Sequence, residues 1–369
     1  MLRLALVTTL LTLVSGCSNV LGYDDVTFDD GSGGAGTSGG GGALGGGPSG
    51  GGSGAAASGG SAGAGGSAAA GGSAAAGGTS GSGGSGTGGT LATGGTTGSG
   101  GATSGAAICS KWKADRGNLD EGTWSGSVAS CNAGDIGPPG RENALRLVNL
   151  YRHLVGLPAV TTATDRDQQA QACALMMHAN GSLSHTPPTN WACYSADGAS
   201  AAGKSNIAST AGVRGVDLYI ADPGNATTMG HRRWILSNTL GPIGLGSTSN
   251  YSCMWVIGGA ASGNNKWTAF PPPGPVPADL FTVSWASVDS TGWTIQSDTI
   301  SLAGAQVTVT SSGQSLPVTV TQLQSGYGSK YAISLRPSGW TSQAGNTYSV
   351  NVTGLSEPIQ YDVEVISCN

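Results

Sequence analysis

The sequence predicts an α+β protein in which helices come first and strands come last. Apolar residues recur at helical spacing over 142–154 and 165–180, whereas the chain after the proline-rich stretch 270–277 alternates polar and apolar residues between turn signals. A break in composition near Trp267 separates the two patterns. The folded residues, from about 108 to 369, are numerous enough for one large domain or two ordinary domains with real cores, and the break in composition favours two.

The N-terminal residues have the pattern of an export signal. An apolar stretch over 4–14 ends in small residues just before Cys17, which predicts a signal peptide over 1–16. These residues resemble the lipobox of bacterial lipoproteins, and the resemblance implies that Cys17 is lipidated, anchors the chain in a membrane and begins the mature N-terminal segment, 17–30. With Ser18 next, the sorting pattern of that family points to the outer membrane of a Gram-negative cell. The alternative is an ordinary cleaved signal followed by an unrelated cysteine.

Residues 31–107 contain no charged side chain and little besides Gly, Ala, Ser and Thr. Such a segment has too little apolar surface to offset the entropy of ordering, so we expect a disordered tether. A random coil of this length reaches about 50 Å. The net charge of the whole chain, -5, is too small to indicate a nucleic acid or another strongly charged partner.

The cysteines beyond Cys17 indicate disulfide bonds. Six remain, and an even number in an exported chain favours three disulfides. None has Cys-x-x-Cys spacing, so a thiolate zinc site is not expected. Fifteen pairings are possible. Proximity in sequence for two bonds and elimination for the third give the expected pairs Cys109–Cys131, Cys173–Cys193 and Cys253–Cys368.

The helix-rich part is assigned to 140–262, after a disulfide-bearing lead-in over 108–139. Its two long helices are followed by Gly156 and Gly181, which suit the ends of helices. Two shorter helices are expected, followed by two buried strands. Their positions are 213–220 and after Thr228 for the helices, and 242–246 and 253–257 for the strands.

Only four histidines occur, and two of them stand in similar settings. His185 is the last residue of a Gly-Ser-Leu-Ser-His segment that follows the second long helix. His231 is the second residue of a Gly-His-Arg-Arg-Trp segment that begins at Gly230. Imidazole binds metals and transfers protons near neutral pH, so this pair is the strongest candidate for a site. His153 and His178 lie on the long helices and fit surface or boundary positions.

Six short segments around these histidines follow one another in a recognisable order. They are Asn149-Leu-Tyr-Arg152, Ala170 with Ala174-Leu-Met-Met, Gly181-Ser-Leu-Ser-His185, Ser205-Asn206-Ile-Ala208, Gly230-His231-Arg and Ile243-Gly-Leu-Gly246. In this order they resemble the CAP superfamily, which comprises cysteine-rich secretory proteins, antigen 5, plant pathogenesis-related proteins and bacterial SCP-like relatives. The resemblance covers about 140–259 and implies an α-β-α sandwich with a cleft.

The resemblance also implies that the cleft holds two histidines and two acidic residues. His185 and His231 match the histidines, and Asp222 falls at the second acidic position. At the first, where the family has Glu before Asn, this chain has Ser205 before Asn206, so one candidate base is absent. In several family members the histidines bind a divalent metal, and two His with one Asp could hold zinc with water in the open position.

Two other motifs around Lys204 do not predict a site. Residues 198–205 match the literal Walker A pattern, but they do not follow a buried strand, and an exported protein meets little ATP, so no nucleotide is expected. Ser205 as a nucleophile lacks the second glycine of a nucleophile elbow. A Lys204 side chain that pointed into the cleft would repel a bound cation.

Residues 263–369 predict a β-sandwich of immunoglobulin-like type, either a support for the first part or an adhesion module. Six short segments have strand patterns and are separated by Gly, Ser and Pro turns. They are 281–285, 300–310, 318–323, 331–335, 347–352 and 361–366. No cluster of titratable residues occurs among them, and Trp285, Trp293 and Trp340 are expected in the core.

Together these features predict a lipid-anchored extracytoplasmic CAP protein that binds an unknown lipid, glycan or protein in its cleft and has no demonstrable catalytic set. Two alternatives stay open. One is a metal-assisted hydrolase that uses His185, His231 and Asp222, with zinc as the possible metal. The other is a purely structural surface protein in which the two histidines hold the loops of the cleft together.

Overall fold

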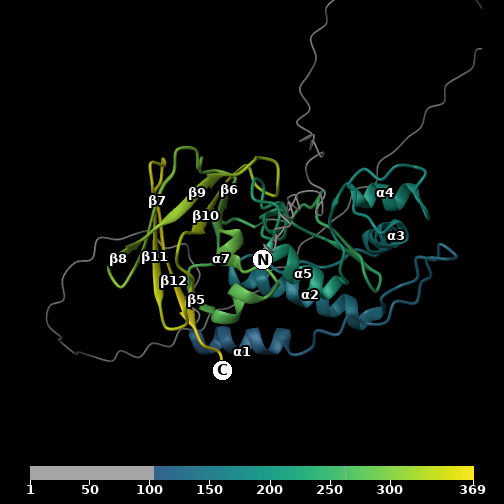
Figure 1. The fold of residues 1–369 in the computed structure, drawn as a ribbon, viewed down its shortest axis with the longest axis horizontal. Helices are drawn as coiled ribbons and strands as arrows, with labels where there is room; N and C mark the ends of the chain where they lie inside the picture. The colour runs from purple at the N-terminus through teal and green to yellow at the C-terminus, as the bar shows by residue number, and fades with distance from the viewer. Residues whose placement is uncertain (1–103, 262) are drawn as a thin grey trace, which may run out of the picture. The chain divides into compact units, whose positions relative to one another are not determined.

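The computed structural model describes residues 104–261 and 263–369 (Figure 1). The predicted signal peptide, Cys17 and most of the predicted tether lie outside the described residues. Helix α1 (Gly105–Arg116) begins within the last residues assigned to the tether, and the Ser104 hydroxyl caps it by accepting the N–H of Ala107 at 3.3 Å. Among the described residues, no helix combines the length and the apolar character needed to span a membrane.

The helix-rich part contains the predicted helices and strands together with elements that were not expected. The bounds are α2 (Gly137–Leu154), α3 (Thr164–Asn180), α4 (Ala196–Ala202), β1 (Ser205–Ala208), α5 (Gly212–Ala221), α6 (Gly230–Ile235), β2 (Gly244–Ser247) and β3 (Ser252–Trp255). Gly181 follows α3 in the left-handed conformation, with φ 58°, which confirms its role at the helix end. β1 is not among the predicted strands because its four consecutive buried residues show no polar alternation.

The three strands of this part form an antiparallel sheet, in the order β1-β3-β2, between two layers of helices. α3 and α4 cover one face, where Ile207, Cys253 and Trp255 pack with apolar residues of α3. α2 and α5 cover the other face, next to Ala208 and Met254. This α-β-α layering places β1 between the helices that carry the candidate site.

The strand-rich part consists of two sheets. One has the order β4-β6-β10-β9 and the other β5-β12-β11-β7-β8, and all neighbours are antiparallel except β5 and β12. The bounds are β4 (Thr268–Phe270), β5 (Gly274–Pro277), the 3-10 helix η2 (Ala278–Thr282), α7 (Val288–Thr291), β6 (Trp293–Ser297), β7 (Gln306–Ser311), β8 (Gln314–Leu316), β9 (Val318–Gln322), β10 (Tyr331–Pro337), β11 (Thr347–Thr353) and β12 (Ile359–Ile366). Apolar residues of both sheets belong to one core.

One predicted strand of this part is wrong. Residues 281–285 lie in and after η2, because the adjacent residues Leu280 and Phe281 are both buried, which a strand with one buried face does not allow. Trp285 is 82% exposed instead of lying in the core, whereas Trp293 is buried as expected. The strand expected over 300–310 begins only at Gln306, after a turn.

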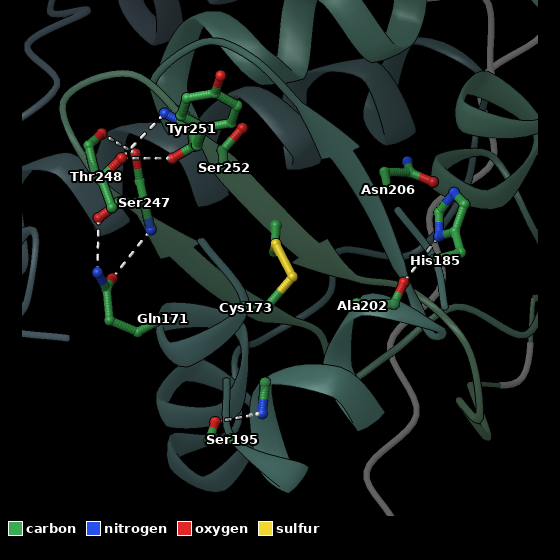
Figure 2. The surroundings of a disulfide bond; sticks show 12 residues. Gln171, Cys173, His185, Ser195, Ala202, Asn206, Ser247, Thr248, Tyr251 and Ser252 are labelled. Atoms are coloured by element: carbon green, nitrogen blue, oxygen red, sulfur yellow. Dashed lines mark hydrogen bonds between the residues drawn. A yellow bond between two sulfur atoms is a disulfide. The ribbon is translucent and has the colours of Figure 1, made fainter. Parts of the chain in front are cut away.

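All six cysteines of the described part form disulfides, as expected, but the predicted pairing is wrong. The bonds are Cys109–Cys368, Cys131–Cys193 and Cys173–Cys253, the last of which is drawn in Figure 2. Proximity in sequence fails because elements far apart in sequence pack together. α3 lies on β3, and α1 lies along β5, which pairs with β12 near the C-terminus.

Two buried arginines join the helix-rich and strand-rich parts. Arg232 of α6 is fully buried and donates to the carbonyl oxygen of Gly292 at 2.6 Å. Arg233 is equally buried and donates to the carbonyl oxygen of Gln324 at 2.7 Å. Apolar residues on both sides of the predicted boundary, 262/263, also belong to one core. The change from helices to strands is therefore not a break in packing.

We predict that Arg232→Ala lowers the free energy of unfolding by about 3–5 kcal/mol, because it leaves several buried carbonyl oxygens without donors. Urea denaturation followed by circular dichroism measures the change. Arg214→Ala is the matched control, since the Arg214 side chain is 82% exposed, and its effect should stay within about 0.5 kcal/mol. An Arg232→Ala variant as stable as this control would contradict the prediction.

Candidate functional site

His231, at the start of α6, is held through one ring nitrogen. Its Nδ1 lies 2.8 Å from Oδ1 of Asp222 and 2.9 Å from Nδ2 of Asn225, and the Asn225 amide also donates to Asp222 Oδ1 at 2.7 Å. Because a carboxylate only accepts hydrogen bonds, Nδ1 carries the proton and donates it to Asp222. In the neutral ring, Nε2 then carries the lone pair. The orientation of the imidazole is therefore set by Asp222.

Asp222 is itself fixed by the backbone around it. It caps the C-terminus of α5 in the left-handed conformation, with φ 54°. Its second oxygen, Oδ2, accepts the backbone N–H of Arg232 at 3.1 Å. Both carboxylate oxygens therefore accept hydrogen bonds, from residues of α6 and from Asn225. Asp222 as a whole is 1% exposed. Asp222 acts on the site through His231.

His185 lies between α3 and α4 and is also held through Nδ1. This atom donates to the carbonyl oxygen of Ala202 at 2.8 Å, a bond drawn in Figure 2 beside Asn206. Burial lowers the pKa of His185 to about 4; the hydrogen bond to Ala202 opposes this shift and the nearby His231 adds to it. His185 is therefore neutral at pH 7, and the two imidazoles lie close enough to influence each other.

Asn206 of β1 connects the strand to α6. Its Nδ2 donates to the backbone oxygen of His231 at 3.1 Å, and its own carbonyl oxygen accepts the hydroxyl of Tyr219 at 3.2 Å. The ring of Tyr219 lies 5.0 Å from that of His231, centre to centre. The structure thus brings His185, His231, Asp222 and Asn206 together, as the resemblance implied.

Ser205, at the position of the family's Glu, lies on the other face of the sheet. Its cross-strand partner is Trp255, and the alternation of a strand directs both side chains toward α3, away from Asn206. Lys204 points the same way, with Nζ 4.7 Å from the centre of the Trp255 ring. Neither residue faces the two histidines. Since α4 is a helix, the Walker A match at 198–205 is not a phosphate loop either.

The donors at this site do not complete a zinc centre. A catalytic zinc usually has three protein ligands and one open position. The Asp222 carboxylate bonds Nδ1 of His231, which is the place of a residue that orients a ligand, not of a ligand. Within residues 104–261 and 263–369, no group of three or more His, Cys, Asp and Glu side chains is arranged to hold a metal ion.

Two kinds of residue at this site were not predicted from the sequence. Asn225, which bridges Asp222 and His231, lies in an Asp-Pro-Gly-Asn turn, and that turn was the available signal. Arg232 and Arg233 gave no signal, because charged residues next to a histidine normally indicate an exposed surface. Both are fully buried, and burial lowers the pKa of each to about 10, so they remain charged at pH 7.

These features define an α+β domain with disulfide bonds and a pair of buried, oriented histidines. Residues 145–257 match the model of the CAP family, described as the cysteine-rich secretory protein family. The chain therefore contains a CAP domain, and the resemblance to this superfamily is confirmed. The matched range includes all four converging residues. Searches among curated proteins and among solved structures gave no significant match.

We predict that His185 makes the protein less stable in acid. Its folded pKa of about 4 lies below the value near 6.5 in the unfolded chain, so the unfolded state binds a proton first as the pH falls. Stability is fully present above about pH 6.5 and decreases by up to about 3 kcal/mol by pH 4. Urea unfolding of the wild type and His185→Gln at pH 7, 5.5 and 4 isolates this term. A difference between them that does not change with pH would contradict the assignment.

Proposed function

We propose that this chain is a lipid-anchored extracytoplasmic CAP-domain protein that binds a ligand in the cleft around His185 and His231 without converting it. The observation that carries the proposal is the fixed orientation of the two imidazoles. His185 Nδ1 donates to the carbonyl oxygen of Ala202, and His231 Nδ1 donates to the carboxylate of Asp222. Polar rings held in this way suit recognition of a ligand with polar groups, as lipids, glycans and proteins have.

The surroundings of the histidines argue against catalysis. His231 and Asp222 have the arrangement of a base and its orienting acid, but covalent catalysis also needs a side-chain nucleophile within reach. Ser205, which stands at the position of the family's Glu, lies on the opposite face of the sheet. Ser205 is therefore not placed to attack a substrate bound at the histidines, and it supplies no carboxylate base there.

The three disulfides support export to an oxidising compartment, where such bonds persist. Anchoring through Cys17 in the outer membrane rests on the lipobox alone.

The strand-rich part is proposed as an immunoglobulin-like support. The strand orders of its two sheets agree with the A-B-E-D and A′-G-F-C-C′ orders of that fold. Tyr348 stands in the place of the tyrosine corner, and the hydroxyl of Tyr348 accepts the N–H of Gln343 at 2.9 Å.

Binding in the cleft should depend on both histidines. We expect the double variant His185→Gln, His231→Gln to bind a lipid or glycan selected on wild-type protein at least about tenfold more weakly, because both oriented imidazoles are removed. A glycan array and a lipid panel select the ligand, and titration calorimetry measures its affinity. His153→Gln, at an exposed position of α2, is the control and should bind normally.

The same proteins distinguish binding from hydrolysis. Turnover of ester or peptide substrates that is lost in His231→Gln would contradict the proposal and favour the hydrolase. Ser205→Ala should change neither binding nor any background turnover, because its side chain faces α3.

The lipid anchor is tested on its own. We expect cells to incorporate labelled palmitate into the wild-type chain and not into Cys17→Ser, and the variant should leave the membrane fraction for the soluble fraction. Equal labelling of both would mean an ordinary cleaved signal. Cys109→Ser, which removes a disulfide cysteine but keeps Cys17, should still be labelled.

A further inference from the structure

β9 forms an outer edge of the four-stranded sheet and has a backbone that points outward. It pairs only with β10 among the described strands. The N–H of Leu323 donates to Ala332 and that of Ser338 donates to Pro317, each at 3.0 Å, so the odd-numbered residues of this segment face β10. The even-numbered residues, Val318, Val320 and Gln322, then direct their N–H and C=O groups to the open edge.

The side chain of Val320 is exposed although it lies on the inner face of the sheet. Its cross-strand partner, Leu335, is fully buried in the core, and partners directly opposite each other share a face. Val320 is nevertheless 38% exposed, and it is one of three large apolar residues that are exposed in the described part of the chain. Among the described strands, none lies beyond β9 in this sheet to cover the Val320 side chain.

The edge is open between Pro317, which precedes the strand, and Gln324, whose N–H donates to the carbonyl oxygen of Thr227 at 3.0 Å. Between these residues there is no charged residue, and the strand itself is Val-Thr-Val-Thr-Gln, without proline or glycine. β-branched residues have a high strand propensity, and charges or prolines are the usual protection of an exposed edge. Its backbone and its apolar side chain therefore suit an additional strand.

We propose that β9 pairs in antiparallel fashion with β9 of a second copy of this chain, about a twofold axis at Val320. In this register Val320 lies opposite its own copy, Thr319 opposite Thr321, and Val318 opposite Gln322. The outward groups of the three even-numbered residues all meet their counterparts, and the two Val320 side chains cover each other on the inner face. The same surface serves both partners, as a twofold interface requires.

The size of the contact sets its strength. Two strands of five residues bury less than the roughly 1,200 Å² of a standard interface, so the dimer is weak, with a dissociation constant on the order of micromolar or above. No charge opposes the pairing, since the strand carries none. A lysine introduced at the axis would place two like charges opposite each other at the centre of the contact.

Sedimentation equilibrium of the full chain over a range of concentrations tests the proposal, in a Cys17→Ala background that keeps the protein free of a lipid anchor and a spare thiol. We expect a monomer–dimer equilibrium that Val320→Lys weakens at least about tenfold. Ser349→Lys is the matched control, because Ser349 is exposed on β11, a strand paired on both sides, and it should leave the equilibrium unchanged. Circular dichroism shows whether each variant is folded.

Cysteine cross-linking tests the register in the same background. Val320→Cys should form a disulfide-linked dimer on a non-reducing gel, because each residue lies opposite its copy. Thr319→Cys should cross-link far less, because it faces Thr321 of the other copy. A chain that stays monomeric at millimolar concentration, a dimer unaffected by Val320→Lys, or equal cross-linking at both positions would overturn the proposal. So would a monomer whose β9 edge instead binds an extended peptide of another protein.

Discussion

The structure depends on the burial of two consecutive guanidinium groups, those of Arg232 and Arg233, in the short helix α6. Their donors end on backbone carbonyl oxygens of α5 and of the strand-rich part, including Ile220 at 2.6 Å and Ser329 at 3.0 Å. A buried cation is tolerated only when its donors are satisfied, so these carbonyls fix the position of α6 on both sides. His231 directly precedes the pair, and its orientation follows from the same constraint.

This arrangement makes the site and the strand-rich part interdependent. A Cβ on Gly230 would lie 2.7 Å from the Tyr327 ring, and one on Gly328 would lie 2.5 Å from the carbonyl oxygen of Arg233. Glycine on both sides of the contact is therefore required for so close an approach. The strand-rich part positions the helix that carries His231, and is not an appendage joined by a linker. This contact is the observation that favours the support role proposed for it.

Much of the fold could be predicted from the sequence. Apolar residues recur at helical spacing in the long helices, and apolar and polar residues alternate along β9 to β12. β1 could not, since its residues are buried on both faces. The helical turn near 281–285 could not either, since Phe-Thr-Val-Ser-Trp alternates apolar and polar residues as a strand does. The disulfide pairs depend on which helix packs on which strand, and no local pattern encodes that. The candidate site was predicted through His185, His231, Asp222 and Asn206, whereas the buried arginines contradict the usual exposure of charge.

The protonation of the site is set by the groups that surround the imidazoles and not by position 205. Ser205, at the position of the family's Glu, faces the opposite side of the sheet from Asn206. Burial lowers the pKa of His185 to about 4. Over the neutral range this ring is uncharged, and its orientation is fixed by the carbonyl oxygen of Ala202. The orientation of His231 is fixed in the same way by a carboxylate that is itself held by the backbone of α6. Both imidazoles are therefore positioned by the fold before any ligand arrives, which is the physical basis on which binding is proposed.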